Sequence, residues 1–181
     1  SAPMNDPDAV MRCVCGVRAT CLVCRPELLE QLSSYAESEQ LSGLRFVAVG
    51  GNRLTPRQRQ AFEEKFDVPL LEGYGAAEVA GAAIVQVPAL RGRSHEKQMA
   101  KKGTVGQPIP GVCARIVGET VDEVLPSGAV GELCLAGPTV MLGYLDDPAL
   151  EKQTLIEGWF RTGDRAAIDE EGHVVLEPDS M

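Results

Sequence analysis

Two glycines and an asparagine stand where a backbone can approach a ligand. Gly50, Gly51 and Asn52 directly follow the apolar run 44–49, which is expected to form a strand. Glycine has no Cβ, so a glycine pair after a strand lets another molecule lie close to the main chain. The pair is a weak signal by itself, because many turns between a strand and a helix contain glycine.

A second segment combines glycines with an aromatic and an acidic side chain. Gly73 and Gly75 flank Tyr74 and are expected to clear space around its ring, which can stack on a flat heterocycle. Glu78 offers hard oxygen ligands that suit Mg²⁺, an ion that bridges nucleotide phosphates. Residues 72–78 follow an expected strand, and open α/β sheets bind ligands beyond the carboxyl ends of their strands. A packed tyrosine and a solvated surface acid explain the same residues equally well.

A third segment, residues 158–164, reads Gly-Trp-Phe-Arg-Thr-Gly-Asp. Its aromatic residues are expected to anchor a strand, with a turn at Gly163 from which Asp164 projects. A carboxylate has acceptor positions for two adjacent ribose hydroxyls. The alternative is an ordinary turn aspartate.

The first half of the chain alternates helical and strand patterns. Helices are expected over residues 6–17, from Pro26 and from Pro56, and strands over 19–23, 44–49, 68–72 and 82–87. Thr55 and Gln58 form a capping box with proline at the first helical position. Leu28, Leu29, Leu32 and Tyr35 share one helix face. Alternating strands and helices predict a parallel sheet covered by helices.

The second half is expected to form a small β-barrel or antiparallel sheet. Short strands are expected over residues 112–117, 130–136, 139–144 and 173–177, with a helix from Pro148 to about Leu155. The predicted organisation is a partial α/β nucleotide-binding subdomain (1–88), a basic connecting loop (89–102) and a β-barrel subdomain (103–181). The loop carries Arg91, Arg93, His95, Lys97, Lys101 and Lys102. It is either a solvated connector or a contact for an acidic carrier or a phosphate.

Composition excludes some function classes. The 181 residues are 44% hydrophobic and 24% charged, as in an ordinary globular protein. A net charge of -9 argues against nucleic-acid binding, whereas backbone amides can still hold a small anion. No apolar run reaches the roughly 18 to 20 residues that span a bilayer, and no signal peptide is evident. These features predict a cytoplasmic protein.

Six cysteines are present, four of them close together: Cys13, Cys15, Cys21 and Cys24. Four close thiols can bind zinc. The favoured interpretation is buried, reduced thiols in an apolar strand-and-helix pattern, because a second CxxC pair at zinc-ribbon spacing is missing.

The ordered motifs resemble those of the adenylate-forming superfamily. Residues 73–78 resemble its YGxTE motif, and residues 159–164 resemble its aromatic-R-T-G-D motif. Between them, residues 103–111 are similar to a GxxGxPxPG segment and residues 131–144 to a GEL…GP…MxGY segment. Any one match can arise by chance, but the ordered set is highly specific.

The resemblance extends from Leu44 to Leu176 and includes the glycine pair at Gly50. Within the superfamily, residues 44–50 and 71–75 look most like the acyl-acyl-carrier-protein synthetase domain of bacterial 2-acylglycerophosphoethanolamine acyltransferases. Fatty acyl-CoA synthetases are similar to a lesser degree.

This resemblance implies an ATP- and Mg²⁺-dependent reaction. A carboxylic acid, fatty in the closest subfamily, would form an acyl-adenylate, and CoA or the phosphopantetheine of acyl carrier protein would accept the acyl group. Tyr74 would stack on adenine, Asp164 would bind the ribose, and residues 79–81 would border the acyl pocket. The implied nucleotide-binding set is Gly50, Gly51, Asn52, Gly73, Tyr74, Gly75, Ala77 and Asp164, with Glu78 as catalytic residue and Mg²⁺ ligand.

The sequence also departs from the family pattern. Ala77 replaces a threonine whose hydroxyl reaches the phosphates, a hydrogen bond worth on the order of 1.5–3 kcal/mol. A Gly-Arg pair is expected after Leu176 and is not found, which leaves Asp179 as a loose candidate for the hinge acid. A Ser/Thr/Gly-rich phosphate loop and a C-terminal domain with a catalytic lysine are also missing. The expectation is therefore a central fragment that is inactive alone, and membrane attachment would need other domains.

Two alternatives remain open. The same fold can serve an amino- or aryl-acid adenylation domain. A degenerate, non-catalytic nucleotide-binding domain is the other alternative. Ala77 and the altered segment 177–181 favour it, and Glu78 and Asp164 weigh against it.

Overall fold

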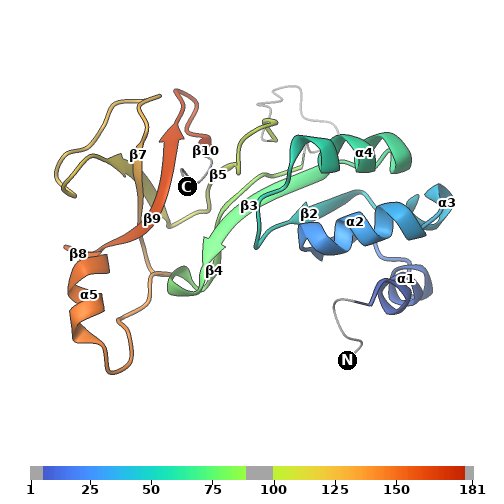
Figure 1. Ribbon diagram of the computed structural model, residues 1–181, viewed down its shortest axis with the longest axis horizontal. Helices are drawn as coiled ribbons and strands as arrows, with labels where there is room; N and C mark the ends of the chain where they lie inside the picture. Colours follow the sequence, from blue (N-terminus) through green and yellow to red (C-terminus); the bar gives the residue numbers. More distant parts are fainter. Residues whose placement is uncertain (1–5, 89–99, 178–181) are drawn as a thin grey trace. The chain divides into compact units, whose positions relative to one another are not determined.

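The computed structural model describes residues 6–88 and 100–177, which form two compact units, residues 1–72 and 73–181 (Figure 1). Strand β3 (Leu70–Ala76) runs through the boundary: residues 70–72 pair with β2 and residues 73–76 with β4. The division falls before the expected boundary at residue 88, because β4 pairs in antiparallel fashion within the second unit. Most of the expected basic loop, residues 89–99, lies outside the described residues.

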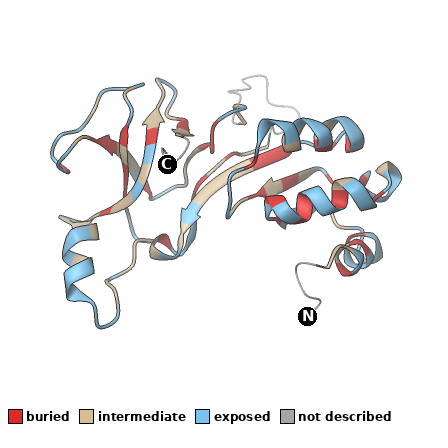
Figure 2. Cartoon of the chain, viewed as in Figure 1, coloured by how far each residue is buried: buried red, intermediate tan, exposed pale blue. Residues whose placement is uncertain are grey.

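The first unit is a parallel sheet with helices, as the alternating pattern predicted. Its strands are β1 (Cys21–Cys24), β2 (Phe46–Val49) and the beginning of β3, and its helices are α1 (Pro7–Gly16), α2 (Pro26–Tyr35), α3 (Ser38–Leu41) and α4 (Pro56–Phe66). Its fully buried side chains include Leu29, Leu32, Leu41, Val47 and Phe62. Much of α4 is exposed in Figure 2, so the helix contributes to the core mainly through two phenylalanines.

Local sequence explains where these helices begin and end. The capping box of Thr55 and Gln58 at the start of α4 is confirmed, and Asp67 ends that helix in the left-handed conformation. In α2 the expected apolar face is formed by leucines, but Tyr35 is 53% exposed. Tyr35 is the last residue of the helix, so its side chain extends past the packed face.

The second unit is mostly antiparallel. The end of β3, the short 3₁₀ helix η1 (Ala77–Val79), β4 (Gly81–Val85) and β5 (Gln107–Pro108) form one part. A second sheet has the order β10-β9-β7-β6, with β8 on β9. Its strands are β6 (Cys113–Val117), β7 (Gly131–Ala136), β8 (Leu155–Ile156), β9 (Trp159–Ile168) and β10 (Val174–Leu176), and α5 (Pro148–Thr154) precedes β8. This mixture of a parallel α/β part and a barrel-type sheet confirms the predicted fold class.

Two local predictions in the second unit are wrong. Residues 139–144 form a loop instead of a strand, since the Met141 amide donates to the Glu78 carbonyl and Leu142 is fully exposed. The turn expected at Gly163 is absent from the described structure, because β9 continues through it as one strand. Among the described residues, no helix is long and apolar enough to cross a bilayer.

Candidate functional site

The structure brings Tyr74 and Asp164 into contact. They lie on β3 and β9, and the Tyr74 hydroxyl donates to Oδ2 of Asp164 at 2.5 Å. Burial raises the pKa of Tyr74 well above its ordinary value, and the hydrogen bond to Asp164 raises it further. The phenol therefore remains protonated and acts as a donor at neutral pH. Two residues selected from separate motifs thus form one polar pair within the second unit.

A bulge in β9 projects Asp164 from the sheet. The register shifts between Glu132 and Cys134 of β7, so residues 162–164 of β9 lie opposite a single residue, Leu133. Gly163 has a φ of 77°, a conformation that favours glycine. Extra residues in one strand of a pair bend it and redirect its side chains. The bulge, rather than a turn, therefore sets the direction of Asp164.

Two neighbouring side chains hold this bulge. The Thr162 hydroxyl donates to the Leu133 carbonyl at 2.8 Å and accepts from the Asp164 amide at 3.1 Å. Glu132 accepts from the Gly163 amide at 3.2 Å and from Nε of Arg161 at 3.0 Å. The hydrogen bond with Glu132 raises the pKa of Arg161.

Sequence reasoning missed this supporting role. Glu132 could have been noticed as an acid inside the apolar run 130–136. Arg161 could have been noticed as a base beside two aromatic residues.

Glu78 lies in η1 and is tied to the loop after β7. Its Oε1 accepts from the Tyr144 hydroxyl at 2.8 Å, and its carbonyl accepts from the Met141 amide at 2.7 Å. That hydrogen bond raises the pKa of Tyr144. A carboxylate has about four acceptor positions, so Tyr144 leaves room for a cation. Mg²⁺ in nucleotide sites takes one or two protein carboxylates together with phosphate oxygens, and Glu78 fits that role.

Gly75 is needed for the close packing of two backbones rather than to clear space around the Tyr74 ring. A Cβ at this position would lie 1.8 Å from the Gly81 carbonyl oxygen, because β3 and β4 approach each other closely beside a register shift. At Gly73 a Cβ would meet the Ile84 carbonyl oxygen at 3.2 Å. The two glycines therefore allow the irregular pairing that carries Tyr74.

The segment after Glu78 only partly suits a pocket wall. Val79 is 1% exposed and belongs to the hydrophobic core, so it does not border an open acyl pocket as expected. Ala80 and Gly81 are exposed. Ala77 is exposed too, which leaves room for a larger side chain at that position.

The other predicted residues, Gly50, Gly51 and Asn52, belong to the first unit. The Gly50 amide donates to the Cys24 carbonyl at 3.2 Å, which ties the loop to the end of β1. Gly51 has a φ of 90° and thus needs glycine. The side-chain amide of Asn52 donates to the Glu27 carboxylate, so Asn52 has a structural partner inside its own unit.

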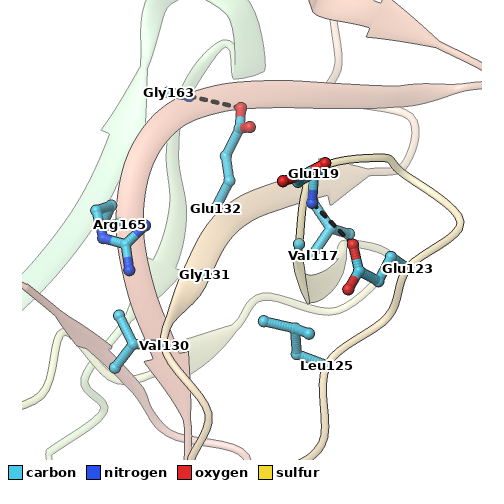
Figure 3. Close-up of a pocket in the computed structure, with 10 residues that line it drawn as sticks. Val117, Glu119, Glu123, Leu125, Val130, Gly131, Glu132, Gly163 and Arg165 are labelled. Atoms are coloured by element: carbon cyan, nitrogen blue, oxygen red, sulfur yellow. Dashed lines mark hydrogen bonds between the residues drawn. The ribbon is translucent and has the colours of Figure 1, made fainter.

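A shallow hollow of about 660 Å³ lies beside the bulge (Figure 3). Glu132 and Arg165 of the two central strands line it together with Glu119 and Glu123 of the loop after β6. The Glu119 amide donates to the Glu123 carboxylate at 2.9 Å. Because Glu132 is paired with Arg161, the carboxylates of Glu119 and Glu123 leave the hollow with an excess of negative charge over Arg165, which disfavours nucleotide phosphates. The Tyr74–Asp164 pair is therefore the better candidate for the nucleotide site.

The N-terminal cysteines do not fit the expectation of buried thiols. Cys13, Cys15 and Cys21 are exposed, and Cys24 is buried. The first two lie on the solvent side of α1, and Cys21 begins the edge strand β1. Among the described residues, the ligand atoms that converge as in a metal site belong instead to a carboxylate and histidine group at the β9–β10 turn.

Known proteins share both the sequence pattern and the fold. The family model described as AMP-binding enzyme matches residues 1–145. An indoleacetate–CoA ligase from Aromatoleum aromaticum is 33% identical over 174 residues, which are 95% of this chain and 32% of that protein. ScoC, a fatty acid–[acyl-carrier-protein] ligase from Streptomyces coeruleorubidus, is 29% identical over 163 residues, 89% of this chain and 30% of that protein.

Solved structures of other proteins share this fold. ATP-bound MatB from Rhodopseudomonas palustris matches with a TM-score of 0.80 and 28% identity, over 94% of this chain and 32% of that chain. This chain spans about a third of the length of the curated relatives named above.

Proposed function

This chain belongs to the AMP-binding enzyme family of adenylate-forming ligases, and we propose that its protein activates a carboxylic acid with ATP and passes the acyl group to a thiol. The observation that carries the proposal is the contact between Tyr74 and Asp164. It places an aromatic ring beside a carboxylate, which suits a nucleoside with its base and its ribose.

In this proposal each of the two side chains contacts a different part of the nucleoside. The Tyr74 ring stacks on adenine, while its hydroxyl fixes one oxygen of Asp164. The carboxylate keeps acceptor positions for the two ribose hydroxyls. Gly73, Gly75 and Ala77 complete the proposed nucleotide-binding set of the second unit, while a nucleotide role for Gly50, Gly51 and Asn52 of the first unit stays a prediction from the sequence.

Glu78 is the proposed Mg²⁺ ligand. Tyr144 orients its carboxylate through the hydrogen bond at 2.8 Å. Bound Mg²⁺ would supply positive charge that neutralises the phosphates during attack by the substrate carboxylate. Because Glu78 is only partly buried, it can meet a nucleotide phosphate from the solvent side.

The proposed acid is fatty, and the proposed acceptor is CoA or the phosphopantetheine of an acyl carrier protein. A relative named as a fatty acid–[acyl-carrier-protein] ligase supports this choice. An aryl acid is the second candidate, supported by the relative named as an indoleacetate–CoA ligase. We also propose a cytoplasmic location, which the six free cysteines support.

The ribose contact is tested by calorimetric titration of the 181-residue chain with ATP and with 2′,3′-dideoxy-ATP. Wild type is expected to prefer ATP at least roughly tenfold, since a hydrogen bond to a charged group contributes on the order of 1.5–3 kcal/mol. Asp164→Ala should lose the preference for ATP. Asp164→Asn, whose side chain has nearly the same shape as that of aspartate, should show a weaker preference for ATP than wild type. Asp122→Ala, at an exposed acid of the same unit, is the control. Full discrimination by Asp164→Ala would remove the ribose role.

The reaction is tested by acid-dependent exchange of pyrophosphate into ATP. A polypeptide of the relatives' length that contains this sequence should exchange with fatty acids, and exchange with aryl acids alone would favour the second candidate. Binding of ATP without exchange for any acid would identify a non-catalytic domain. The 181 residues alone are expected to show no exchange, because they span about a third of the relatives' length.

A further inference from the structure

The turn between β9 and β10 gathers three potential metal ligands. Asp169, Glu171 and His173 alternate along the chain, and one ligand atom from each lies within 4.8 Å of the others. Oδ1 of Asp169 accepts from the amides of Glu171 at 2.9 Å and His173 at 2.8 Å. The Gly172 amide donates to the Asp169 carbonyl at 3.0 Å. These backbone hydrogen bonds hold the turn in one conformation, so the three side chains are already assembled.

His173 supplies an independent observation that points to a ligand. The residue is 4% exposed, and neither of its ring nitrogens has a hydrogen-bond partner among the residues that the structure describes. An unsatisfied buried polar group is costly, and such groups are rare in folded proteins. Its Nδ1 faces Oδ1 of Asp169 at 3.6 Å and Oε2 of Glu171 at 3.8 Å, too far for hydrogen bonds.

The two carboxylates already attract a cation. Nζ of Lys101 lies 2.7 Å from Oδ2 of Asp169 and 3.0 Å from Oε2 of Glu171. The Lys101 side chain is 43% exposed, so its ammonium can leave for solvent at little cost. Lys101 satisfies the negative charge but offers nothing to the imidazole of His173, because ammonium has no acceptor and lies on the carboxylates.

We propose that Asp169, Glu171 and His173 bind a divalent metal ion of the zinc type, in competition with Lys101. An imidazole nitrogen with two carboxylates suits zinc, whereas Mg²⁺ and Ca²⁺ favour oxygen ligands alone. Two ligands at about 2.0–2.1 Å from a tetrahedral zinc ion lie roughly 3.3 Å apart. The separations of 3.6 and 3.8 Å from the His173 nitrogen need only a small contraction.

Charge and exposure support a preformed site. Asp169 and Glu171 bring two carboxylates to the site, and the position of Lys101 shows that together they attract a cation. Glu171 is 67% exposed, which gives the ion a route from solvent and leaves a coordination position for water.

The site is tested by nuclear magnetic resonance of the full 181-residue chain with ¹⁵N-labelled histidine during titration with Zn²⁺. The chain has two histidines, so His173→Gln assigns the ring signals and His95→Gln is the matched control. Zn²⁺ should shift Nδ1 of His173 in wild type and in His95→Gln. Because the readout is this nitrogen, zinc bound by exposed cysteines does not imitate the result. An unshifted His173 ring would refute the site.

A second variant tests the competition with Lys101. Removal of the ammonium frees both carboxylates for the ion, so Lys101→Met should tighten Zn²⁺ binding at His173 by roughly fivefold to tenfold. Lys152→Met, at an exposed lysine of α5, should leave the affinity unchanged. Weaker or unchanged binding in Lys101→Met would contradict competition at these carboxylates. Neither experiment depends on nucleotide or on the proposed ligase reaction.

Discussion

At the scale of single residues, the carboxylate of Asp164 is held in place by its neighbours. The Tyr74 hydroxyl donates a hydrogen bond to Oδ2, and the Thr162 hydroxyl accepts a hydrogen bond from the Asp164 amide. A polar group that is oriented before the ligand arrives spends less free energy on reorganisation. Tyr144 does the same for Glu78. The two acids proposed to bind ribose and Mg²⁺ thus each have a dedicated tyrosine.

Ala77 offers a gain-of-function prediction at this scale. Ala77→Thr should tighten ATP binding by roughly tenfold, because a restored hydroxyl can donate to a phosphate and such a bond contributes on the order of 1.5–3 kcal/mol. The exposed position accommodates the larger side chain. Ala77→Val, which has the shape of threonine without the hydroxyl, should bind ATP as wild type does. Calorimetry decides, and equal affinities for the threonine and valine variants would exclude the hydroxyl contact.

At the scale of elements, β9 carries most of the site in the second unit. It pairs with β7 between residues 160 and 166, with β10 over residues 166–168 and with β8 at its start, so both ends of the strand are held by a neighbour on each side. The bulge opposite Leu133 interrupts this regular pairing at one place. That interruption lets a strand otherwise committed to the sheet present Asp164 to a ligand.

The bulge predicts different effects on ATP binding for two glycine-to-alanine substitutions. Gly163→Ala should cost about 1–2 kcal/mol of unfolding free energy through its φ of 77°, although a Cβ there meets no atom within 4 Å. It should also weaken ATP binding severalfold, because it moves Asp164. Gly158→Ala has nearly the same strain, with a φ of 81° and equal space, but lies in the turn before β9. Urea unfolding should give similar losses for both variants, and only Gly163→Ala should change the ATP affinity. Similar ATP affinities for the two would mean that the bulge does not direct Asp164.

At the scale of the whole molecule, each unit has its own core and its own buried thiol. Burial raises the pKa of Cys24 in the first unit and of Cys134 in the second to about 11. From the ordinary thiol pKa of 9.0, such a shift lowers the thiolate fraction at pH 8 by roughly a hundredfold. Both thiols should therefore resist alkylation in the native protein, while the exposed Cys113 reacts.

The buried thiols can show whether the two units unfold separately. Phe62→Ala should cost about 3–5 kcal/mol in the first core, where Phe62 is fully buried. We expect Cys24 to react quickly with iodoacetamide in this variant while Cys134 stays protected, as measured by mass spectrometry of peptides. Cys113 is the internal control and should react equally in both proteins. Simultaneous exposure of Cys24 and Cys134 would show that the units unfold as one.

The sequence by itself determined the local features and the family. Capping residues and prolines set the helix starts, since the hydrogen bonds involved lie within a few residues of each other. The motifs around Tyr74, Glu78 and Asp164 identified the adenylate-forming superfamily, which the comparisons confirm. Motifs of this kind are contiguous segments, so their residues can be read without knowing which strands pair.

Tertiary structure alone decided how those segments meet. The hydrogen bond between Tyr74 and Asp164 joins residues 90 positions apart, and the β9 bulge exists only relative to the register of β7. The loop at 139–144, expected as a strand, is held by the backbone of Glu78. Local periodicity contains no information on such long-range pairing. The same reason applies to His173, whose burial without a hydrogen-bond partner among the described residues follows from packing rather than from its neighbours in sequence.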